Sequence, residues 1–123
     1  HLLLVDDTDI NREIAKELLE MVGFTVDIAV DGVEAVNKFN ESAPGSIDAI
    51  LMDVQMPNMN GYEATKTIRE SNHPDAKNII IIAMTANAFV EDVAKSLEAG
   101  MNDHLAKPID TELMYQVLGR YLK

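Results

Sequence analysis

The sequence predicts a doubly wound α/β domain in which five βα units form a five-stranded parallel sheet with helices on both faces. Short continuous apolar runs alternate along the chain with segments whose apolar residues recur at helical spacing. Such runs are typical of strands buried on both faces of a parallel sheet. A chain of 123 residues, 47% of them hydrophobic, has enough apolar material for one core. We therefore expect a single domain over residues 1–123.

The predicted strands follow the apolar runs and cover residues 2–5, 25–29, 47–52, 79–84 and 103–106. Right-handed crossovers between parallel strands then place the helices on both faces of the sheet. The helices are predicted from apolar residues that fall near one helical face, namely Ile10, Ile14, Leu18 and Met21 in the first, Val93, Leu97 and Met101 in the fourth, and Leu113, Val117 and Tyr121 in the last.

Residues typical of helix ends support these boundaries. Asp31, three residues before Glu34, predicts a capped start of the second helix, and Asp110 is expected to cap the last helix. Gly23 and Gly100 stand where helices should end. The pattern of alternating elements and caps therefore agrees along the whole chain.

The charge balance limits the classes of partner. The chain has 10 basic and 21 acidic residues, so its formal net charge is 10 − 21 = −11. This charge argues against direct binding to a nucleic acid backbone or to an anionic membrane, and favours a cation or a basic protein surface.

The sequence contains no cysteine and no apolar run near the roughly 18 residues that span a bilayer. We expect a cytoplasmic location. Because the sequence opens at His1, directly before an apolar run, we also expect a domain excised from a larger protein, which could itself be membrane-anchored.

Polar residues stand at the predicted carboxyl ends of four strands. Asp6 and Asp7 follow the first strand, Asp53 the third, Thr85 the fourth and Lys107 the fifth. Ligands of open parallel sheets bind beyond the carboxyl ends of the strands, where the strand order reverses. We therefore expect these five side chains to converge at one edge of the sheet.

Three carboxylates in one crevice repel one another unless a cation is bound or one of them is protonated. Mg²⁺ prefers oxygen ligands and commonly uses one or two carboxylates, so Asp6, Asp7 and Asp53 are candidate ligands, with a backbone carbonyl near Gln55 as a further one. An aspartate can also attack phosphorus and form an acyl phosphate. Each feature alone has an ordinary explanation as well, such as an acidic pair at a helix start or a solvated loop lysine.

Several segments together resemble one known family. They are Val5-Asp6-Asp7, the stretch from Met52 to Gly61, Met84-Thr85-Ala86, and Lys107-Pro108. In order and spacing they closely resemble the receiver domain of response regulators in two-component signalling, and the resemblance extends from Leu2 to Leu122. It implies the flavodoxin-like (βα)5 fold with strand order 2-1-3-4-5.

The resemblance also implies roles for the site residues. Asp53 would be the phosphorylation site, Asp6 and Asp7 would bind Mg²⁺ with it, and Mn²⁺ is an alternative ion. Thr85 and Lys107 would bind the phosphoryl oxygens.

Neighbouring positions would tune this site. Ala86 would leave room for the phosphoryl group, and the peptide bond before Pro108 would be cis. Gln55 and Asn87 are expected to tune the lifetime of the phosphorylated form. His104 occupies the position at which many receivers carry a switching Tyr or Phe, so an aromatic switch is in question here.

The implied function is a phosphorelay switch that accepts a phosphoryl group from a phosphohistidine, changes conformation and slowly dephosphorylates itself. The implied partners are a histidine kinase or a histidine phosphotransfer domain, and the last two helices could form a transient dimer. The stretches 11–13, 84–88 and 100–104 look most like receivers attached to hybrid histidine kinases. A stand-alone receiver and one linked to an effector domain remain open.

The sequence argues against three other classes of protein. Mg²⁺-dependent phosphatases with an Asp nucleophile have an Asp-x-Asp pattern at the nucleophile, whereas in this sequence Gln55 stands at the second Asp position. The chain also has no length for the cap domain of such enzymes. A flavodoxin-like carrier would need a phosphate-binding loop after the first strand, where Asp6 and Asp7 would repel a flavin phosphate. A phosphorylation-independent interaction domain would have lost a site residue, yet all are present.

Overall fold

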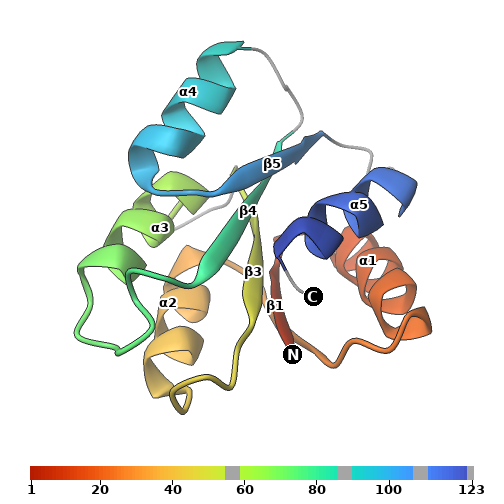
Figure 1. The fold of residues 1–123 in the computed structure, drawn as a ribbon, viewed down its shortest axis with the longest axis horizontal. Helices are drawn as coiled ribbons and strands as arrows, with labels where there is room; N and C mark the ends of the chain where they lie inside the picture. Colours follow the sequence, from red (N-terminus) through yellow and green to blue (C-terminus); the bar gives the residue numbers. More distant parts are fainter. Residues whose placement is uncertain (55–58, 86–89, 107–110, 122–123) are drawn as a thin grey trace.

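The computed structural model describes residues 1–54, 59–85, 90–106 and 111–121. Strands and helices alternate along the chain as predicted (Figure 1). In order they are β1 (Leu2–Val5), α1 (Asp9–Met21), β2 (Val26–Ala29), α2 (Gly32–Glu41), β3 (Ala49–Asp53), α3 (Gly61–Glu70), β4 (Ile80–Thr85), α4 (Val90–Ala99), β5 (Asp103–Ala106) and α5 (Thr111–Tyr121).

The five strands form one parallel sheet in the order β2-β1-β3-β4-β5, which confirms the predicted topology. The strand order reverses at β1 and β3, since β1 pairs with β2 on one side and with β3 on the other. The structure places β3 and β4 one or two residues later than the sequence analysis did. As a result Asp53 and Thr85 are the last residues of their strands.

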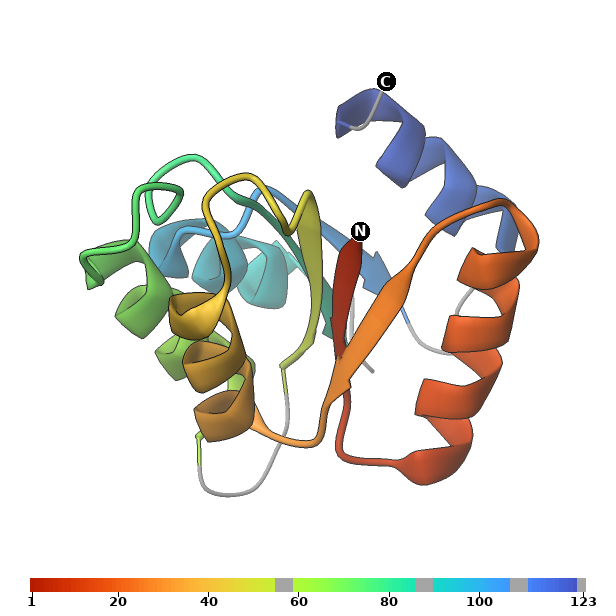
Figure 2. The same ribbon diagram turned by 90° about the horizontal axis from the view of Figure 1, so that it is seen from below.

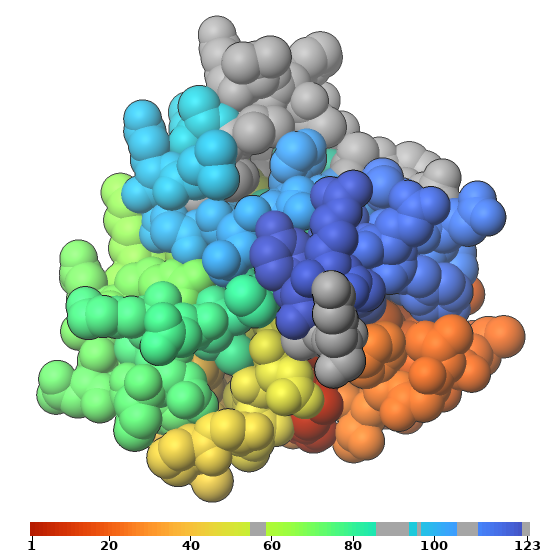
Figure 3. All heavy atoms as spheres, in the orientation of Figure 1, coloured from red at the N-terminus to blue at the C-terminus, as the bar shows by residue number. Residues whose placement is uncertain are grey.

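Two apolar cores form because successive residues of each strand point to opposite faces of the sheet. Leu2 and Leu4 face α1 and α5, whereas Leu3 and Val5 face α2 and α3. Figure 2 shows this division of the helices between the two faces. On the face shown in Figure 3, α1 and α5 lie side by side and only a small part of the N-terminal segment reaches the surface. None of the helices in the described part of the chain is long and apolar enough to cross a membrane.

The apolar residues from which α1 was predicted lie mostly on its exposed side. Ile10, Ile14 and Met21 are 67%, 53% and 79% exposed, while the buried apolar residues of the helix are Ala15 and Leu19. Two neighbouring apolar stripes run along this helix, and periodicity alone does not tell which of them meets the sheet. An apolar surface is therefore left on the outside of α1.

The other helices show the same limit of periodicity. Leu97 of α4 and Leu113 of α5 are 59% and 41% exposed, although both belong to the apolar faces from which these helices were predicted. Met101 and Val117, which belong to the same two sets of residues, are buried. Leu18 and Tyr121 are half-buried against the core that contains α1 and α5.

The predicted helix ends are confirmed where the structure describes them. The Asp31 carboxylate accepts a hydrogen bond of 2.8 Å from the Glu34 amide and so caps α2. Gly23 and Gly100 adopt φ values of +96° and +105°, a conformation that favours glycine at helix ends. Asp110 lies outside the described residues.

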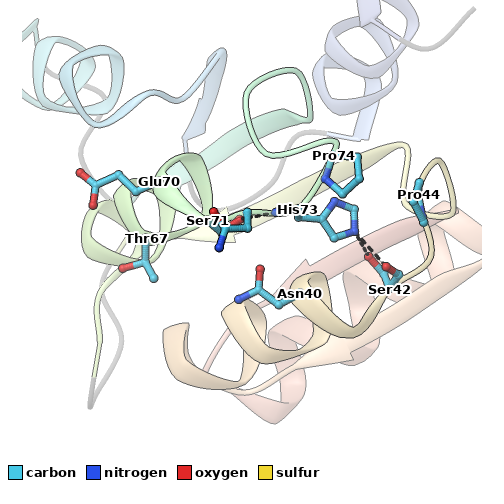
Figure 4. A pocket seen from close by; sticks show the side chains of 9 residues that line it. Asn40, Ser42, Pro44, Thr67, Glu70, Ser71, His73 and Pro74 are labelled. Carbon is cyan, nitrogen blue, oxygen red and sulfur yellow. Dashed lines mark hydrogen bonds between the residues drawn. The ribbon is translucent and has the colours of Figure 1, made fainter.

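A buried histidine closes the end of the domain at which the strands begin. His73 donates through Nε2 to the Ser42 carbonyl (2.9 Å) and accepts the Asp75 amide at Nδ1 (3.0 Å). Its ring centroid lies 4.3 Å from that of Phe39. A pocket opens beside this histidine, between the ends of α2 and α3 (Figure 4). His73 therefore ties the segment after α2 to the segment after α3.

Two glycines hold the segment that follows β3. The Gly61 amide donates to the Val54 carbonyl (2.9 Å), and a Cβ atom at Gly61 would lie 2.3 Å from the Asp53 carbonyl oxygen. The Gly32 amide donates to the Met59 carbonyl (3.2 Å), and a Cβ atom there would lie 2.4 Å from that oxygen. Backbone therefore packs directly on backbone at both places, which only glycine permits.

We predict that Gly61→Ala destabilises the domain by about 1–3 kcal/mol, because the added methyl group meets backbone that cannot move away easily. Gly119→Ala is the matched control. A Cβ atom at this helical position of α5 meets nothing within 4 Å, so alanine should stabilise by about 0.5–1 kcal/mol. Urea unfolding of both variants measures the difference. Equal stability of the two variants would contradict the close packing at Gly61.

Candidate functional site

Three carboxylates lie together at the carboxyl end of the sheet. One oxygen of each of Asp6, Asp7 and Asp53 can be chosen so that all three lie within 4.8 Å of one another. We call these residues the acidic cluster. The structure thus brings together the three acids that the sequence analysis singled out.

The pairing of β1 with β3 explains this arrangement. Val5 is the register partner of Met52, so Asp6 and Asp53 each follow a paired residue on neighbouring parallel strands. The Asp6 amide still donates to the Ala29 carbonyl of β2 (3.2 Å). The main chain is therefore held by the sheet up to Asp6, and the carboxylate at that point is placed by the sheet.

The acids differ in their surroundings. Asp6 and Asp53 are each 3% exposed, whereas Asp7 is exposed. The Thr8 amide donates to Oδ1 of Asp6 (2.9 Å), which fixes the orientation of that carboxylate. The cluster thus has a buried floor of two carboxylates and one acid at its open side.

Thr85 lies beside the cluster on the next strand. Asp53 is the register partner of Met84, so Thr85 directly follows the residue paired with Asp53, and it is 7% exposed. The remaining site candidates, namely Lys107, Gln55, Ala86, Asn87 and Pro108, lie outside the described residues.

The chemistry of the acidic cluster fits a hard divalent cation. All its donors are carboxylate oxygens, the type that Mg²⁺ prefers. These oxygens lie within 4.8 Å of one another, so Asp6, Asp7 and Asp53 together would hold such an ion.

One buried residue near the site was not assigned a role from sequence. Arg12 of α1 is 9% exposed, and its Nη1 donates to the Asp6 carbonyl at 2.6 Å. Its other terminal nitrogen pairs with the Asp9 carboxylate. The only sequence signal was an arginine six residues after the first acid on a predicted helix, which is too weak to assign a contact.

His104 lies on β5, the strand next to β4. It pairs with Ala83 in the register of β4 and β5, and its side chain is 34% exposed, with Nδ1 3.7 Å from the Asp103 carboxylate. Burial and the Asp103 carboxylate raise the pKa of Tyr121, whose hydroxyl donates to that carboxylate at 3.3 Å. The end of α5 is therefore attached to β5 next to His104.

Arg69 connects α3 to the segment between α4 and β5. Its Nη2 donates to the Gly100 carbonyl (2.8 Å) and to Oδ1 of Asn102 (3.0 Å), and Asn102 accepts the Ile81 amide at the same oxygen (2.8 Å). Burial lowers the pKa of this guanidinium. These bonds join the helices that border β4 and β5 to the sheet.

Known proteins are similar to this chain in sequence. "Hybrid signal transduction histidine kinase L" of Dictyostelium discoideum is 40% identical over 122 residues, which cover 98% of this chain and 7% of that protein. Sensor histidine kinase RcsC of Salmonella typhimurium is 38% identical over 120 residues, covering 98% of this chain and 12% of that protein. The chain thus spans a small part of these relatives.

Solved structures agree. The receiver domain of a sensor histidine kinase from Pseudomonas aeruginosa, crystallised with a magnesium ion in its active site cleft, has a TM-score of 0.86 and 38% identity, with 98% of this chain and 94% of that chain covered. The receiver domain of Saccharomyces cerevisiae Ssk1, in complex with the histidine phosphotransfer protein Ypd1, has a TM-score of 0.86 and 32% identity, with 98% and 86% covered.

The family comparison covers nearly the whole chain, because residues 2–119 match the response regulator receiver domain. The match includes every member of the acidic cluster and Thr85. The chain belongs to the family of response regulator receiver domains.

Proposed function

We propose that this domain accepts a phosphoryl group from a phosphohistidine onto Asp53. A carboxylate oxygen of Asp53 attacks the phosphorus, the P–N bond breaks, and its electron pair returns to the imidazole nitrogen. The observation that carries the proposal is the acidic cluster, in which Asp53 lies at the end of β3, a central strand, beside Asp6 and Asp7.

The neighbouring residues suit this chemistry. Phosphoryl transfer needs positioning and charge neutralisation more than covalent help from the protein. Bound Mg²⁺ would supply the charge neutralisation, and Asp6, Asp7 and Asp53 would hold it. The Thr85 hydroxyl and the Lys107 ammonium group would bind phosphoryl oxygens, which gives the phosphorylated form contacts that the free form lacks.

We propose finer roles for five further residues. Gln55 would contribute a backbone carbonyl to the metal, and Gln55 and Asn87 would border the path of the hydrolytic water. Ala86 would leave space for the phosphoryl group, and a cis peptide at Pro108 would orient Lys107. His104, which follows the Asp103 that binds Tyr121 of α5, would change its position on phosphorylation at the face formed by α4, β5 and α5.

We propose that the parent protein is a hybrid histidine kinase with this receiver, residues 1–123, on its cytoplasmic side. The support is the 38–40% identity to hybrid and sensor histidine kinases over 98% of the chain. The magnesium-bound Pseudomonas receiver and the Ypd1-bound yeast receiver are precedents for the ion and the partner. Mn²⁺ is expected to replace Mg²⁺, and a transient dimer would use α4 and α5.

Mg²⁺ and a small phosphodonor should add one phosphoryl group to the protein, and Asp53→Asn should abolish labelling because the amide is a poor nucleophile. Asp27→Asn, an exposed acid on β2, is the control and should be labelled like the wild type. Intact-mass spectrometry measures the label. Full labelling of Asp53→Asn would refute the assignment.

Mg²⁺ should raise the melting temperature of the wild type, since the cation relieves repulsion within the acidic cluster. Binding to the native state alone gives about 2.7 kcal/mol when free Mg²⁺ is 100 times its dissociation constant. Asp7→Asn removes a ligand and a source of repulsion, so it should melt higher than wild type in chelator and gain less from Mg²⁺. Melting curves at fixed ionic strength test this; a variant that melts lower under both conditions contradicts it.

We propose that the phosphodonor protein docks on the exposed apolar surface of α1, which starts three residues after Asp6 and displays Ile10 and Ile14. Ile14→Glu should slow transfer from phosphorylated Ypd1 by roughly tenfold or more while leaving labelling by a small phosphodonor unchanged. Met21→Glu places the same charge at the far end of α1 and should have little effect. Equal transfer rates for the two variants in rapid-quench assays would place docking elsewhere.

A further inference from the structure

A buried guanidinium lies under the acidic end of the domain. The side chain of Arg12 is 10% exposed, and buried arginine is rare unless it is paired. It is held between the carbonyl of Asp6 (2.6 Å) and the carboxylate of Asp9. Asp9 itself is 86% exposed, so the buried partner of this guanidinium is the backbone at Asp6.

The contact falls where the main chain leaves β1. The Arg12 amide donates to the Thr8 carbonyl (3.0 Å), and the Thr8 amide donates to the Asp6 carboxylate (2.9 Å). Two hydrogen bonds therefore hold the turn from Asp6 to Thr8. The Thr8 amide binds the Asp6 carboxylate, and the Arg12 guanidinium binds the Asp6 carbonyl. A charge-assisted bond is about twice as strong as a neutral one.

We infer that Arg12 is a positioning residue for the cation site. It fixes the Asp6 carbonyl, and so sets the direction in which Asp6 and Asp7 present their carboxylates to Asp53. This inference rests on the proposed function, because the cation is part of that proposal. Residues that orient metal ligands commonly alter metal affinity by 10–100-fold when they are replaced.

Charge alone predicts the opposite result. A positive charge near three carboxylates opposes the binding of a second cation, so its removal should tighten Mg²⁺ binding if electrostatics were its main influence. Positioning predicts weaker binding. The sign of the change in Mg²⁺ affinity therefore distinguishes positioning from electrostatics. A general loss of stability does not change the Mg²⁺ affinity of a variant that is still folded.

The experiment is calorimetric titration of Mg²⁺ into wild type, Arg12→Met and Lys16→Met, each shown to be folded by its melting curve. Methionine keeps much of the apolar length of arginine. Lys16→Met removes the same charge from α1 at a residue whose side chain makes no hydrogen bond or ion pair with the described residues. We expect Arg12→Met to weaken Mg²⁺ binding by about tenfold or more, and Lys16→Met to leave it unchanged or slightly tighter.

Binding by Arg12→Met as tight as that of the wild type, or tighter, would overturn the inference. If Arg12→Met does not fold, Arg12→Lys provides the test. Lysine keeps the charge but cannot bridge Asp6 and Asp9 with one planar group, so the Mg²⁺ affinity of this variant should fall below that of the wild type. An Mg²⁺ affinity equal to that of the wild type would overturn the inference. Absence of Mg²⁺ binding by the wild type would instead refute the metal site of the proposed function.

Discussion

The carboxylates of Asp6, Asp7 and Asp53 repel one another, and the fold holds them close together against that repulsion. One oxygen of each carboxylate lies within 4.8 Å of the others, and two of the three acids are 3% exposed. Holding these negative charges together costs electrostatic free energy in a chain that is already strongly acidic. The three acids stand at the carboxyl ends of β1 and β3, and these two strands are neighbours in the sheet. The apolar cores on both faces hold that sheet together and so keep Asp6 and Asp53 at the ends of neighbouring strands.

The backbone near the acids is fixed by close contacts of several kinds. Gly61 packs against the Asp53 carbonyl, and Arg12 donates to the Asp6 carbonyl. At the opposite end of the sheet, His73 joins the segments after α2 and α3. The pocket beside His73 is therefore far from the chemistry, and its lining carries no acidic cluster.

Much of the fold was predictable because every level of the sequence agreed. The apolar run of β1 and the glycines at 23 and 100 place elements whose order then allows few topologies. The three acids could also be predicted to meet, since the carboxyl ends of parallel strands share one edge. The strand order itself came from resemblance to a family and not from periodicity.

What the sequence did not reveal depends on contacts that no local pattern encodes. Ala15 and not Ile14 is the inward residue of α1, where it packs in the core that also contains residues of β1 and α5. The burial of Arg12 follows from that same orientation, because the helix turns its arginine toward the end of β1. One orientation of α1 thus places a guanidinium under the acids and two isoleucines in solvent. A helix that supports the site on its inner side is then well placed to display a partner surface on its outer side.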